Sequence, residues 1–554
     1  MNIEVLLYKK KVIKDNINDF LFKNGLLFAK TRNNVLKGKI EDTFVFFIYD
    51  IIDSNISKLL NDSITDESFN YYLNNEGYDI FVNRDDDTLL LVYNEIKNIL
   101  EIYTSYSEKS LVFYYLNKHY VRISNSYNQI VNDEKFNAKI NENKIVEQLV
   151  FFYNSNETFF ENLFMANNGD KIIFRNNKVS HINNPIKSSK LIKYNKISDY
   201  KEHFYSIFNK SLMNEVQKYN DVNIMQSSGL DSMLILSSLV EIKDLNINTI
   251  TSVPYYDISH SNRNVDESYL IKKYAKLYKN IKTNFIDNKN IDIIKSLNNF
   301  IDIHNGLIHA AGNVYWLTDI YRLSKNKLLM HGSAGNFTVS WPIPFIYNIN
   351  SSYGIQNIVK KKIKGVFKKN NYRKSIYNRV NENTIYTKQL KVKMNDFISD
   401  IFNNKLSVID SDSQQQYLIN KYRKSIYPLF SFSEYYNMNL FDPTNTPEII
   451  RFMLSIPDEL FYKKEQRFFI KSILKDKLPN EIVNNKLRGL QASDINLRLL
   501  KQKKEIIRTI DLLNRDNSVT KLFNLNSDFD IFSNNSRKLL FFSLFLHKNN
   551  YYGK

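Results

Sequence analysis

Hydrophobic residues in the first 192 positions mostly alternate with polar ones or form short runs rich in β-branched and aromatic side chains. Runs of this kind at 43–48 (TFVFFI), 111–115 (LVFYY) and 170–174 (DKIIF) are typical of strands joined by turns. Between them, residues 144–153 have helical spacing. The pattern predicts a β-rich α+β domain over residues 1–192.

Near residue 198 the pattern changes, because strands begin to alternate with helices. A helix predicted over 200–219 is followed by strand 222–226, helix 231–240, strand 249–253, helix 266–278, strand 283–286, a helix in the 290s and strand 327–331. Such alternation favours a parallel α/β sheet. We therefore predict a second domain over 198–554, mainly helical beyond Trp341.

The sequence has no pattern of a secretory signal or a membrane span. The apolar stretch near the N-terminus is short and precedes its lysines, which is not the layout of a signal peptide. The apolar run at 539–546 (LLFFSLFL) is far shorter than the ~18 residues that cross a bilayer. We interpret it as a core helix or a docking surface, and we expect a cytoplasmic protein with no membrane partner.

The amino-acid composition excludes several kinds of catalytic and binding site. The chain has 554 residues, 43% hydrophobic and 24% charged, as in ordinary globular proteins, and no cysteine. A disulfide scaffold, a cysteine nucleophile, a cysteine zinc site and an iron–sulfur cluster are therefore excluded. The net charge of 76 − 58 = +18 is spread over the chain, densest at 360–374, and we interpret it as solvated surface rather than a nucleic-acid site.

Residues 227–232 (SSGLDS) lie between a predicted strand and a predicted helix. Such a turn presents backbone N–H groups, a helix N-terminus and serine hydroxyls to an anion, and Gly229 permits its close approach. Asp231 would repel a phosphate unless a divalent cation joined the two, which implies Mg²⁺. The alternative is a Ser or Asp cap on an ordinary helix.

This segment resembles the SGGxDS pyrophosphate-binding loop of ATP pyrophosphatases, with Ser228 in place of the first glycine. Its position after a long N-terminal domain resembles asparagine synthetase and its relatives. Asp266 and Glu267 are similar to the family's DE-then-helix element, and 328–336 (LLMHGSAGN) to its strand followed by GxGGDE.

Three further segments resemble the asparagine-synthetase-like lasso peptide cyclases. They are 335–341 (GNFTVSW), 442–444 (DPT) with the following helix and Ile456-Pro457, and 488–494 (RGLQASD). The resemblance implies a degenerate glutaminase-like (Ntn-type) domain at 1–192. It implies a parallel-sheet ATP-pyrophosphatase (HUP-like) synthetase domain at 198–554 with a helical C-terminal extension.

The resemblance also implies ATP and Mg²⁺ as cofactors and gives roles to particular residues. The residues that would bind ATP and pyrophosphate are Ser227, Ser228, Gly229, Asp231, Ser232, Ser252, Val253, Gly332 and Gly335. The metal ligands would be Asp231 and Asn336. Lys486 and Arg488 match the cations that face the transition state in the family, where fixed positive charge stabilises developing negative charge; the alternative is two surface cations.

Two positions depart from the family pattern. Asn336 stands where the family has a second metal-binding Asp, and its amide oxygen brings no charge to a metal. Asn439 stands where many relatives have a Glu shortly before DPT, so a general base would have to come from the substrate or from another carboxylate such as Glu434. Both departures leave open whether the chain is fully active.

The N-terminal domain resembles a glutaminase domain most clearly at 145–178. A working glutaminase of this class needs an N-terminal cysteine, and the chain has none. The amine must then come from elsewhere, such as a peptide N-terminus. The domain would be structural or would help to hold a peptide.

These observations predict an ATP-dependent ligase that adenylates a carboxylate, as a lasso peptide cyclase that forms a macrolactam (isopeptide) bond in a precursor peptide. A leader-binding protein and a leader peptidase are its expected partners by analogy. Three alternatives remain open: an amidotransferase using ammonia or another small amine, a nucleotide-binding pseudoenzyme, and a tRNA-modifying ATP pyrophosphatase.

Overall fold

The computed structural model describes most of the chain. The described residues are 4–8, 21–22, 25–26, 34–49, 60, 64–82, 84–109, 111–137, 139–150, 156–175, 178–187, 191–256, 268–305, 314–341, 373–401, 415, 419, 422–423, 427–462, 465–485, 493–525 and 529–551. They form two compact units, one of residues 1–141, 154–187 and 446–448, the other of 142–153, 188–445 and 449–554.

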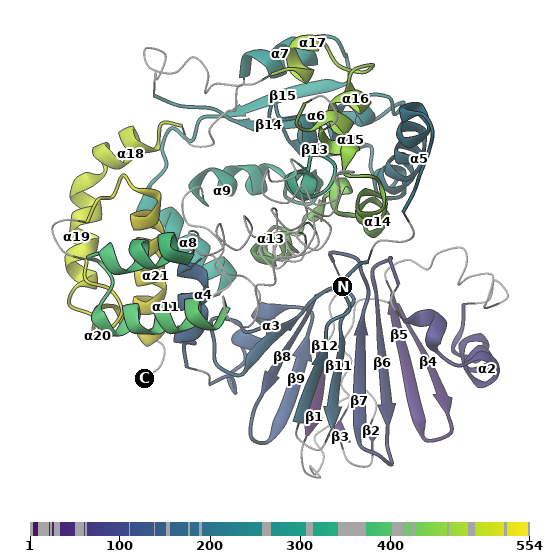
Figure 1. Cartoon of the computed structure of the whole chain (residues 1–554). Helices are drawn as coiled ribbons and strands as arrows, with labels where there is room; N and C mark the ends of the chain where they lie inside the picture. The colour runs from purple at the N-terminus through teal and green to yellow at the C-terminus, as the bar shows by residue number, and fades with distance from the viewer. Residues whose placement is uncertain are drawn as a thin grey trace, which may run out of the picture. The chain divides into compact units, whose positions relative to one another are not determined.

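The first unit is built on two antiparallel sheets (Figure 1). The six-stranded sheet has the order β12-β11-β7-β6-β5-β4, with β4 (Asn34–Ile40), β5 (Thr43–Tyr49), β6 (Thr88–Asn94), β7 (Ile99–Thr104), β11 (Lys171–Arg175) and β12 (Lys178–Ile182). The four-stranded sheet has the order β1-β9-β8-β10, with β1 (Glu4–Tyr8), β8 (Val112–Leu116), β9 (Tyr120–Ser124) and β10 (Leu163–Ala166). The predicted strands at 43–48, 111–115 and 170–174 are confirmed.

Strand β5 is buried on both faces. Phe46 and Ile48 join a core that also holds Val112 and Ile123 of the four-stranded sheet, so the two sheets pack face to face. The alternate residues, including Phe47, contact α2 (Asp66–Glu76) and the short helix η1 (Asp79–Phe81). This accounts for the nearly continuous apolar run of β5. Smaller elements of the unit are α3 (Tyr127–Val131) and the hairpin β2 (Leu21–Phe22) and β3 (Gly25–Leu26).

The second unit contains a parallel five-stranded sheet of order β15-β14-β13-β16-β17. Its strands are β13 (Asp221–Met225), β14 (Asn246–Ser252), β15 (Ile281–Ile286), β16 (Leu328–Met330) and β17 (Asn439–Phe441). The prediction of a parallel sheet is confirmed, and four strands lie where the pattern put them. The fifth, β17, falls in the region predicted to be mainly helical, because three residues are too few to show a period.

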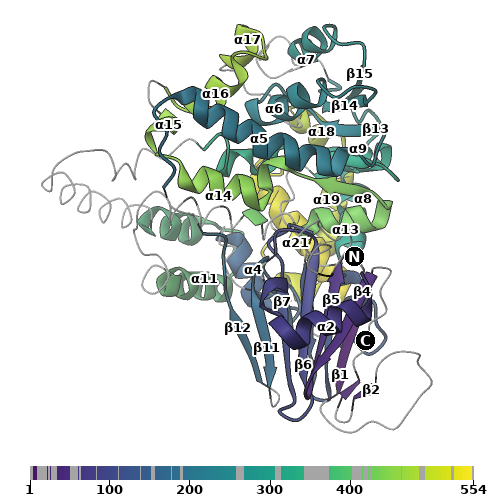
Figure 2. The same ribbon diagram turned by 90° about the vertical axis from the view of Figure 1, so that its right-hand side faces the viewer.

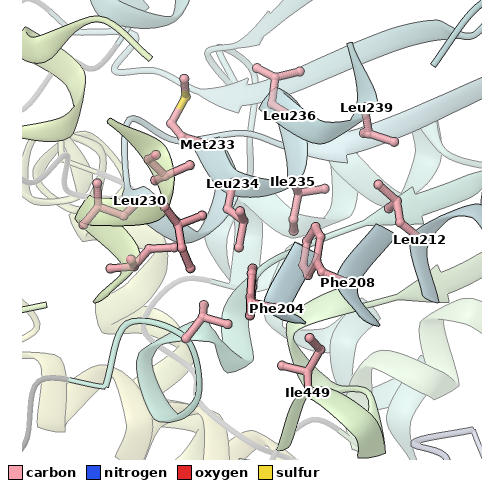
Figure 3. Packing of buried hydrophobic residues seen from close by; sticks show 14 of the residues in the cluster. Phe204, Phe208, Leu212, Leu230, Met233, Leu234, Ile235, Leu236, Leu239 and Ile449 are labelled. Atoms are coloured by element: carbon pink, nitrogen blue, oxygen red, sulfur yellow. The ribbon is translucent and has the colours of Figure 1, made fainter. Parts of the chain in front are cut away.

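Helices cover both faces of this sheet. On one face, α5 (Ile197–Val216), α6 (Leu230–Leu239), α14 (Pro447–Ser455) and α16 (Phe468–Leu474) share one hydrophobic core with the strands (Figure 3). Val222 and Ile224 of β13 join that core. Asn223, between them, faces the other side, where its amide donates to Leu323 O at the end of α9 (Val314–Leu323). The sheet is therefore the middle layer of three.

Further helices of this unit are α7 (Ser268–Ala275), α8 (Ile293–His304), α13 (Tyr427–Tyr436), α15 (Glu459–Tyr462) and α17 (Asn480–Val483), with 3-10 turns η2 (Ser333–Phe337) and η4 (Pro443–Asn445). A helical group follows, with α11 (Lys388–Asp400), α18 (Ile495–Lys501), α19 (Lys503–Leu513), α20 (Asn517–Thr520) and α21 (Asn534–Tyr551) (Figure 1). Figure 2 shows α11, α19 and α21 from a second side. The run at 539–546 lies in α21, and its apolar side chains are buried, which confirms a core helix. Across the described residues, no helix is both long and apolar enough to traverse a lipid bilayer.

One helix from the N-terminal part of the sequence packs in the second unit. Helix α4 (Glu142–Leu149) contacts α11, a contact that the sequence division at 192 does not anticipate. Glu142 forms ion pairs with Lys393 and Lys521. Burial alone would raise the pKa of Glu142, but the hydrogen bonds and charges of the two lysines lower it below its usual value.

Candidate functional site

The strand order of the parallel sheet marks the carboxyl ends of β13 and β16 as the place where a ligand is expected, and we call this place the crevice. From the central strand β13 the chain moves outwards to β14 and β15 on one side, and then returns to β16 and β17 on the other. Ligands of open α/β sheets bind outside the carboxyl ends of the strands at such a reversal. The carboxyl ends of β13 and β16 carry two glycine-bearing loops, 226–229 and 331–332, so both sequence-predicted loops lie at this place.

The first loop is held together by the Ser232 hydroxyl. The Ser227 N–H donates to Ser232 Oγ at 3.2 Å, and the two serine hydroxyl oxygens lie 3.0 Å apart. Gly229 N–H donates to Ser227 Oγ at 3.1 Å. Ser232 Oγ also lies within donating distance of two carbonyl oxygens of the loop, 2.9 Å from Ser227 O and 3.1 Å from Gly229 O. The serines thus fix the shape of the loop before any ligand binds.

Helix α6 begins directly after this loop. Gly229 is its N-cap, with φ −71° and ψ 148°, and has no side chain with which to cap the first turn. The N–H groups of the first turn and the positive end of the helix dipole therefore face the crevice as an anion-binding feature. Asp231 lies in this first turn and is 8% exposed.

The second loop and the 3-10 turn η2 that continues it pack directly against Asp231. A Cβ atom built on Gly335 would lie 2.3 Å from both Cγ and Oδ1 of Asp231, and one on Gly332 would lie 3.1 Å from its backbone carbon. Real Cβ atoms do not approach other atoms as closely as 2.3 Å, so Gly335 must be glycine for the loops to meet in this way. The structure therefore brings together Asp231, Gly332 and Gly335, which the sequence analysis had singled out separately.

Asp442, the first residue of the DPT segment, ties the second loop to the sheet. Its carboxylate is fully buried and accepts from Ala334 N–H at 2.9 Å and from Thr444 N–H at 2.9 Å. Thr338 Oγ donates to Thr444 O at 2.9 Å, and the ring of His331 lies 3.4 Å from the same carboxylate. The DPT segment thus holds the loop that carries Gly335.

An arginine that the sequence analysis did not single out lies beside Asn336. The Nη2 group of Arg467 donates to Asn336 Oδ1 at 3.0 Å. Arg467 comes just before α16, in a segment with no periodic or motif pattern, so the sequence offered no indication of this contact. Arg467 adds a positive charge next to the second loop.

Ser252 and Val253 lie at the carboxyl end of β14, the strand next to β13, as the resemblance implied. The following loop is fixed by Asp494, whose carboxylate accepts from the N–H groups of Tyr255 and Tyr256 at 2.8 and 3.1 Å. Asp494 also forms a buried bidentate pair with Arg498, with distances of 2.9 and 2.8 Å. The end of the RGLQASD segment therefore reaches the same edge of the sheet.

Lys486 and Arg488, the predicted catalytic cations, lie outside the described residues, as do Asp266 and Glu267. The residues that flank 486–492 are described. Asn485, directly before Lys486, donates to Ser228 Oγ at 3.0 Å, and Asp494 is anchored to the loop after β14. Both flanks thus lie at the carboxyl edge of the sheet.

Asn439 and Glu434 lie at the opposite edge. Asn439 is the first residue of β17, and its side-chain amide contacts the hydroxyl of Tyr219, which precedes β13. Glu434 lies in the last turns of α13, shortly before β17 begins. Neither residue is at the carboxyl ends of the strands, so a general base would have to come from elsewhere.

A cavity of about 670 Å³ opens beside the end of β15. Acidic and basic side chains both line it, among them Asp319, Lys295 and Arg322. Arg498 donates to the carbonyl oxygens of Asp287 and Asn288 in its wall. Two of the lining charges pair with each other, because Arg322 Nη2 lies 3.2 Å from Asp319 Oδ1.

The residues at the crevice fit a magnesium–phosphate group. Mg²⁺ in proteins usually keeps several waters and is held by one or two carboxylates together with substrate phosphates. Asp231 supplies one carboxylate beside uncapped N–H groups. Within the described ranges, no three His, Asp or Glu side chains gather as a metal cage. The phosphates would therefore have to supply the remaining charged ligands.

Comparison with known proteins adds little to this geometry. No protein-family model and no curated protein matches the sequence. Among solved structures, the chain is similar to an NH3-dependent NAD synthetase from Campylobacter jejuni, at 15% identity over 39% of this chain and 100% of that chain. The TM-score of 0.18 is too low to support an argument.

Proposed function

We propose that the chain is an ATP- and Mg²⁺-dependent ligase that activates a carboxylate as an acyl-adenylate and joins it to an amine. The observation that carries this proposal is the contact of Gly335 with Asp231 at the strand reversal. It joins an anion-binding helix N-terminus, a carboxylate and a second loop in one crevice.

The loop residues would hold the phosphates. The N–H groups at the start of α6 and the hydroxyls of Ser227 and Ser228 would donate to phosphate oxygens, while the Ser232 hydroxyl holds the loop in shape. Ser252 and Val253 would meet the adenine with their backbone. Asp231 would hold Mg²⁺, whereas Asn336 Oδ1, the second ligand that the resemblance implies, already accepts from Arg467. When bound, Mg²⁺ neutralises phosphate charge and so makes pyrophosphate a better leaving group.

The reaction needs both an activated carboxylate and a deprotonated amine. A carboxylate oxygen attacks the α-phosphorus of ATP and pyrophosphate leaves. The amine then attacks the acyl carbon, AMP leaves and one proton is lost. We assign Lys486 and Arg488 to stabilise the negative charge that develops in these steps. The positions of Asn485 and Asp494, the described residues on either side, support this assignment.

We propose a precursor peptide as the substrate, in which an Asp or Glu side chain is activated and the N-terminal amine closes a macrolactam ring. The motifs shared with lasso peptide cyclases and the absence of cysteine, which rules out ammonia release by a cysteine glutaminase, support this choice. A leader-binding protein and a leader peptidase would then act with the enzyme.

Product analysis tests the reaction. The purified protein is incubated with ATP, Mg²⁺ and a leader-free peptide that has a free N-terminus and an internal Asp or Glu. We expect AMP, pyrophosphate and a peptide that has lost one water. ADP as the sole nucleotide product would reject the reaction class. AMP and pyrophosphate formed only with ammonia or a small amine would reject the peptide substrate but keep the ligase.

Asn336 favours a second candidate, a nucleotide-binding pseudoenzyme, because its amide brings no charge to a metal. Such a protein would bind ATP but release no pyrophosphate with any of a panel of carboxylates. Pyrophosphate release above a matched Asp231→Asn variant would exclude this candidate.

A further inference from the structure

The contact between Arg467 and Asn336 brings a positive charge to a position where the family pattern has a negatively charged aspartate. Asn336 directly follows Gly335, the residue packed against Asp231. Its Oδ1 atom, the only atom of the side chain that could bind a metal, accepts a hydrogen bond from Arg467 at 3.0 Å. A fixed cation therefore lies where a second carboxylate would be needed to hold a second metal.

Charge favours an anion at this position over a cation. A guanidinium repels Mg²⁺ at short range and attracts phosphate. Arginine presents five N–H donors in a planar fork that matches phosphate oxygens, so one hydrogen bond to Asn336 is compatible with others to a ligand.

Arg467 has a backbone conformation that is unfavourable for an arginine. Its φ of 61° is in the left-handed region, which a residue such as Arg adopts at a cost. In the part of the chain that the structure describes, the other non-glycine residues with positive φ are Asn, Asp or Glu. The loop before α16 keeps an unfavourable conformation at the residue that contacts Asn336.

We propose that Arg467 binds the β- and γ-phosphates of ATP, and the pyrophosphate product, in place of a second metal ion, and that Asn336 positions its guanidinium. This inference rests on the proposed function. It makes the site a one-metal site in which Asp231 holds Mg²⁺ and Arg467 supplies the remaining positive charge.

Binding of pyrophosphate, measured by calorimetry over a range of Mg²⁺ concentrations, tests this assignment without catalysis. We expect Arg467→Gln to weaken binding at least tenfold at saturating Mg²⁺, and Arg467→Lys to weaken it less, because the charge stays but the planar fork is lost. Lys471→Gln is the matched control: it removes a cation of α16 that pairs with Glu465, and binding should not change.

A second pair of variants gives an independent result. Asn336→Asp should weaken pyrophosphate binding, because the new carboxylate pairs with Arg467. In the double variant Asn336→Asp/Arg467→Gln, binding should recover only at high Mg²⁺ with a steeper Mg²⁺ dependence, as expected for two metals.

The possible failures are distinguishable. If the wild-type protein binds neither pyrophosphate nor Mg·ATP, the proposed function itself fails. If it binds them and folded Arg467→Gln binds equally well, only the role of Arg467 fails. If Arg467→Gln does not fold, unchanged binding and Mg²⁺ dependence in Asn336→Asp would overturn the proposal.

Discussion

Gly335 in η2 and Asp231 in the first turn of α6 are more than a hundred residues apart in the sequence, yet a Cβ atom on Gly335 would lie 2.3 Å from the Asp231 carboxyl carbon. We predict that Gly335→Ala displaces the Asp231 side chain and weakens Mg·ATP binding by at least tenfold. The added methyl group should also lower the free energy of unfolding by about 1–3 kcal/mol, as overpacking usually does. Calorimetric titration and denaturant unfolding measure the two effects.

Gly38→Ala in β4 of the first unit is the control for that variant. Its added Cβ would lie 2.4 Å from Cδ1 of the buried Leu73, so it overpacks its surroundings to a similar degree without touching the loops of the crevice. Stability should fall, but Mg·ATP binding should not change. Equal losses of binding in the two variants would show that the contact between Gly335 and Asp231 has no special role.

Asp442 is expected to matter for stability rather than for chemistry. In Asp442→Asn, the new amide group would face a backbone N–H of Ala334 or Thr444 and leave a buried donor without its acceptor. We predict a loss of about 1–3 kcal/mol in the free energy of unfolding. Asp476→Asn, which alters a largely exposed pair with Lys201, should cost less than about 0.5 kcal/mol. Similar losses of unfolding free energy in both variants would contradict the role of Asp442 in holding the second loop.

The pair of Asp494 and Arg498 should be among the most sensitive positions of the second unit. Both side chains are almost fully buried, at 1% and 3% exposure. Arg498→Met leaves the Asp494 charge buried without its guanidinium, which costs about 3–5 kcal/mol. Denaturant unfolding measures this, with Lys273→Met in an exposed pair with Glu481 as control. A loss of stability no larger than that of the control would show that the pair of Asp494 and Arg498 does not stabilise the second unit.

Much of this fold could be predicted from local patterns. Strand β13 and helix α6 follow from apolar runs of clear period, and the SSGLDS loop between them follows from its position. The motif identifies Gly335 as a loop glycine but does not predict its contact with Asp231. That contact depends on how β16 pairs with β13. Long-range contacts of this kind leave no periodic pattern.

Other features left no local pattern at all. Strand β17 is three residues long and is stabilised by pairing with β16 rather than by its own sequence. Arg467 is one of many cations, and its contact with Asn336 depends on the packing of α16. Asn439 is close to DPT in the sequence, but it begins strand β17 and DPT follows the end of that strand. Asn439 therefore lies at the amino end of the sheet, away from the loops that would bind the ligand.

The attachment of α4 to α11 should depend on pH through Glu142. Because Lys393 and Lys521 hold the pKa of Glu142 in the folded protein below its usual value of 4.5, the ionised form is favoured by folding. The stabilisation is therefore present above about pH 4.5 and is lost as the pH falls through the folded pKa. Unfolding of wild type and Glu142→Gln compared at pH 7 and at pH 3 measures this. A difference that grows in acid would contradict it.

Calorimetric titration with a non-hydrolysable ATP analogue tests most directly whether the crevice binds nucleotide through Asp231. It is carried out with and without Mg²⁺ on the wild-type protein, on Asp231→Asn, and on Asp199→Asn, which changes a first-turn carboxylate of α5. We predict Mg²⁺-dependent binding in wild type and Asp199→Asn, and binding at least tenfold weaker in Asp231→Asn. No binding in the wild type, or equal binding in Asp231→Asn, would contradict it.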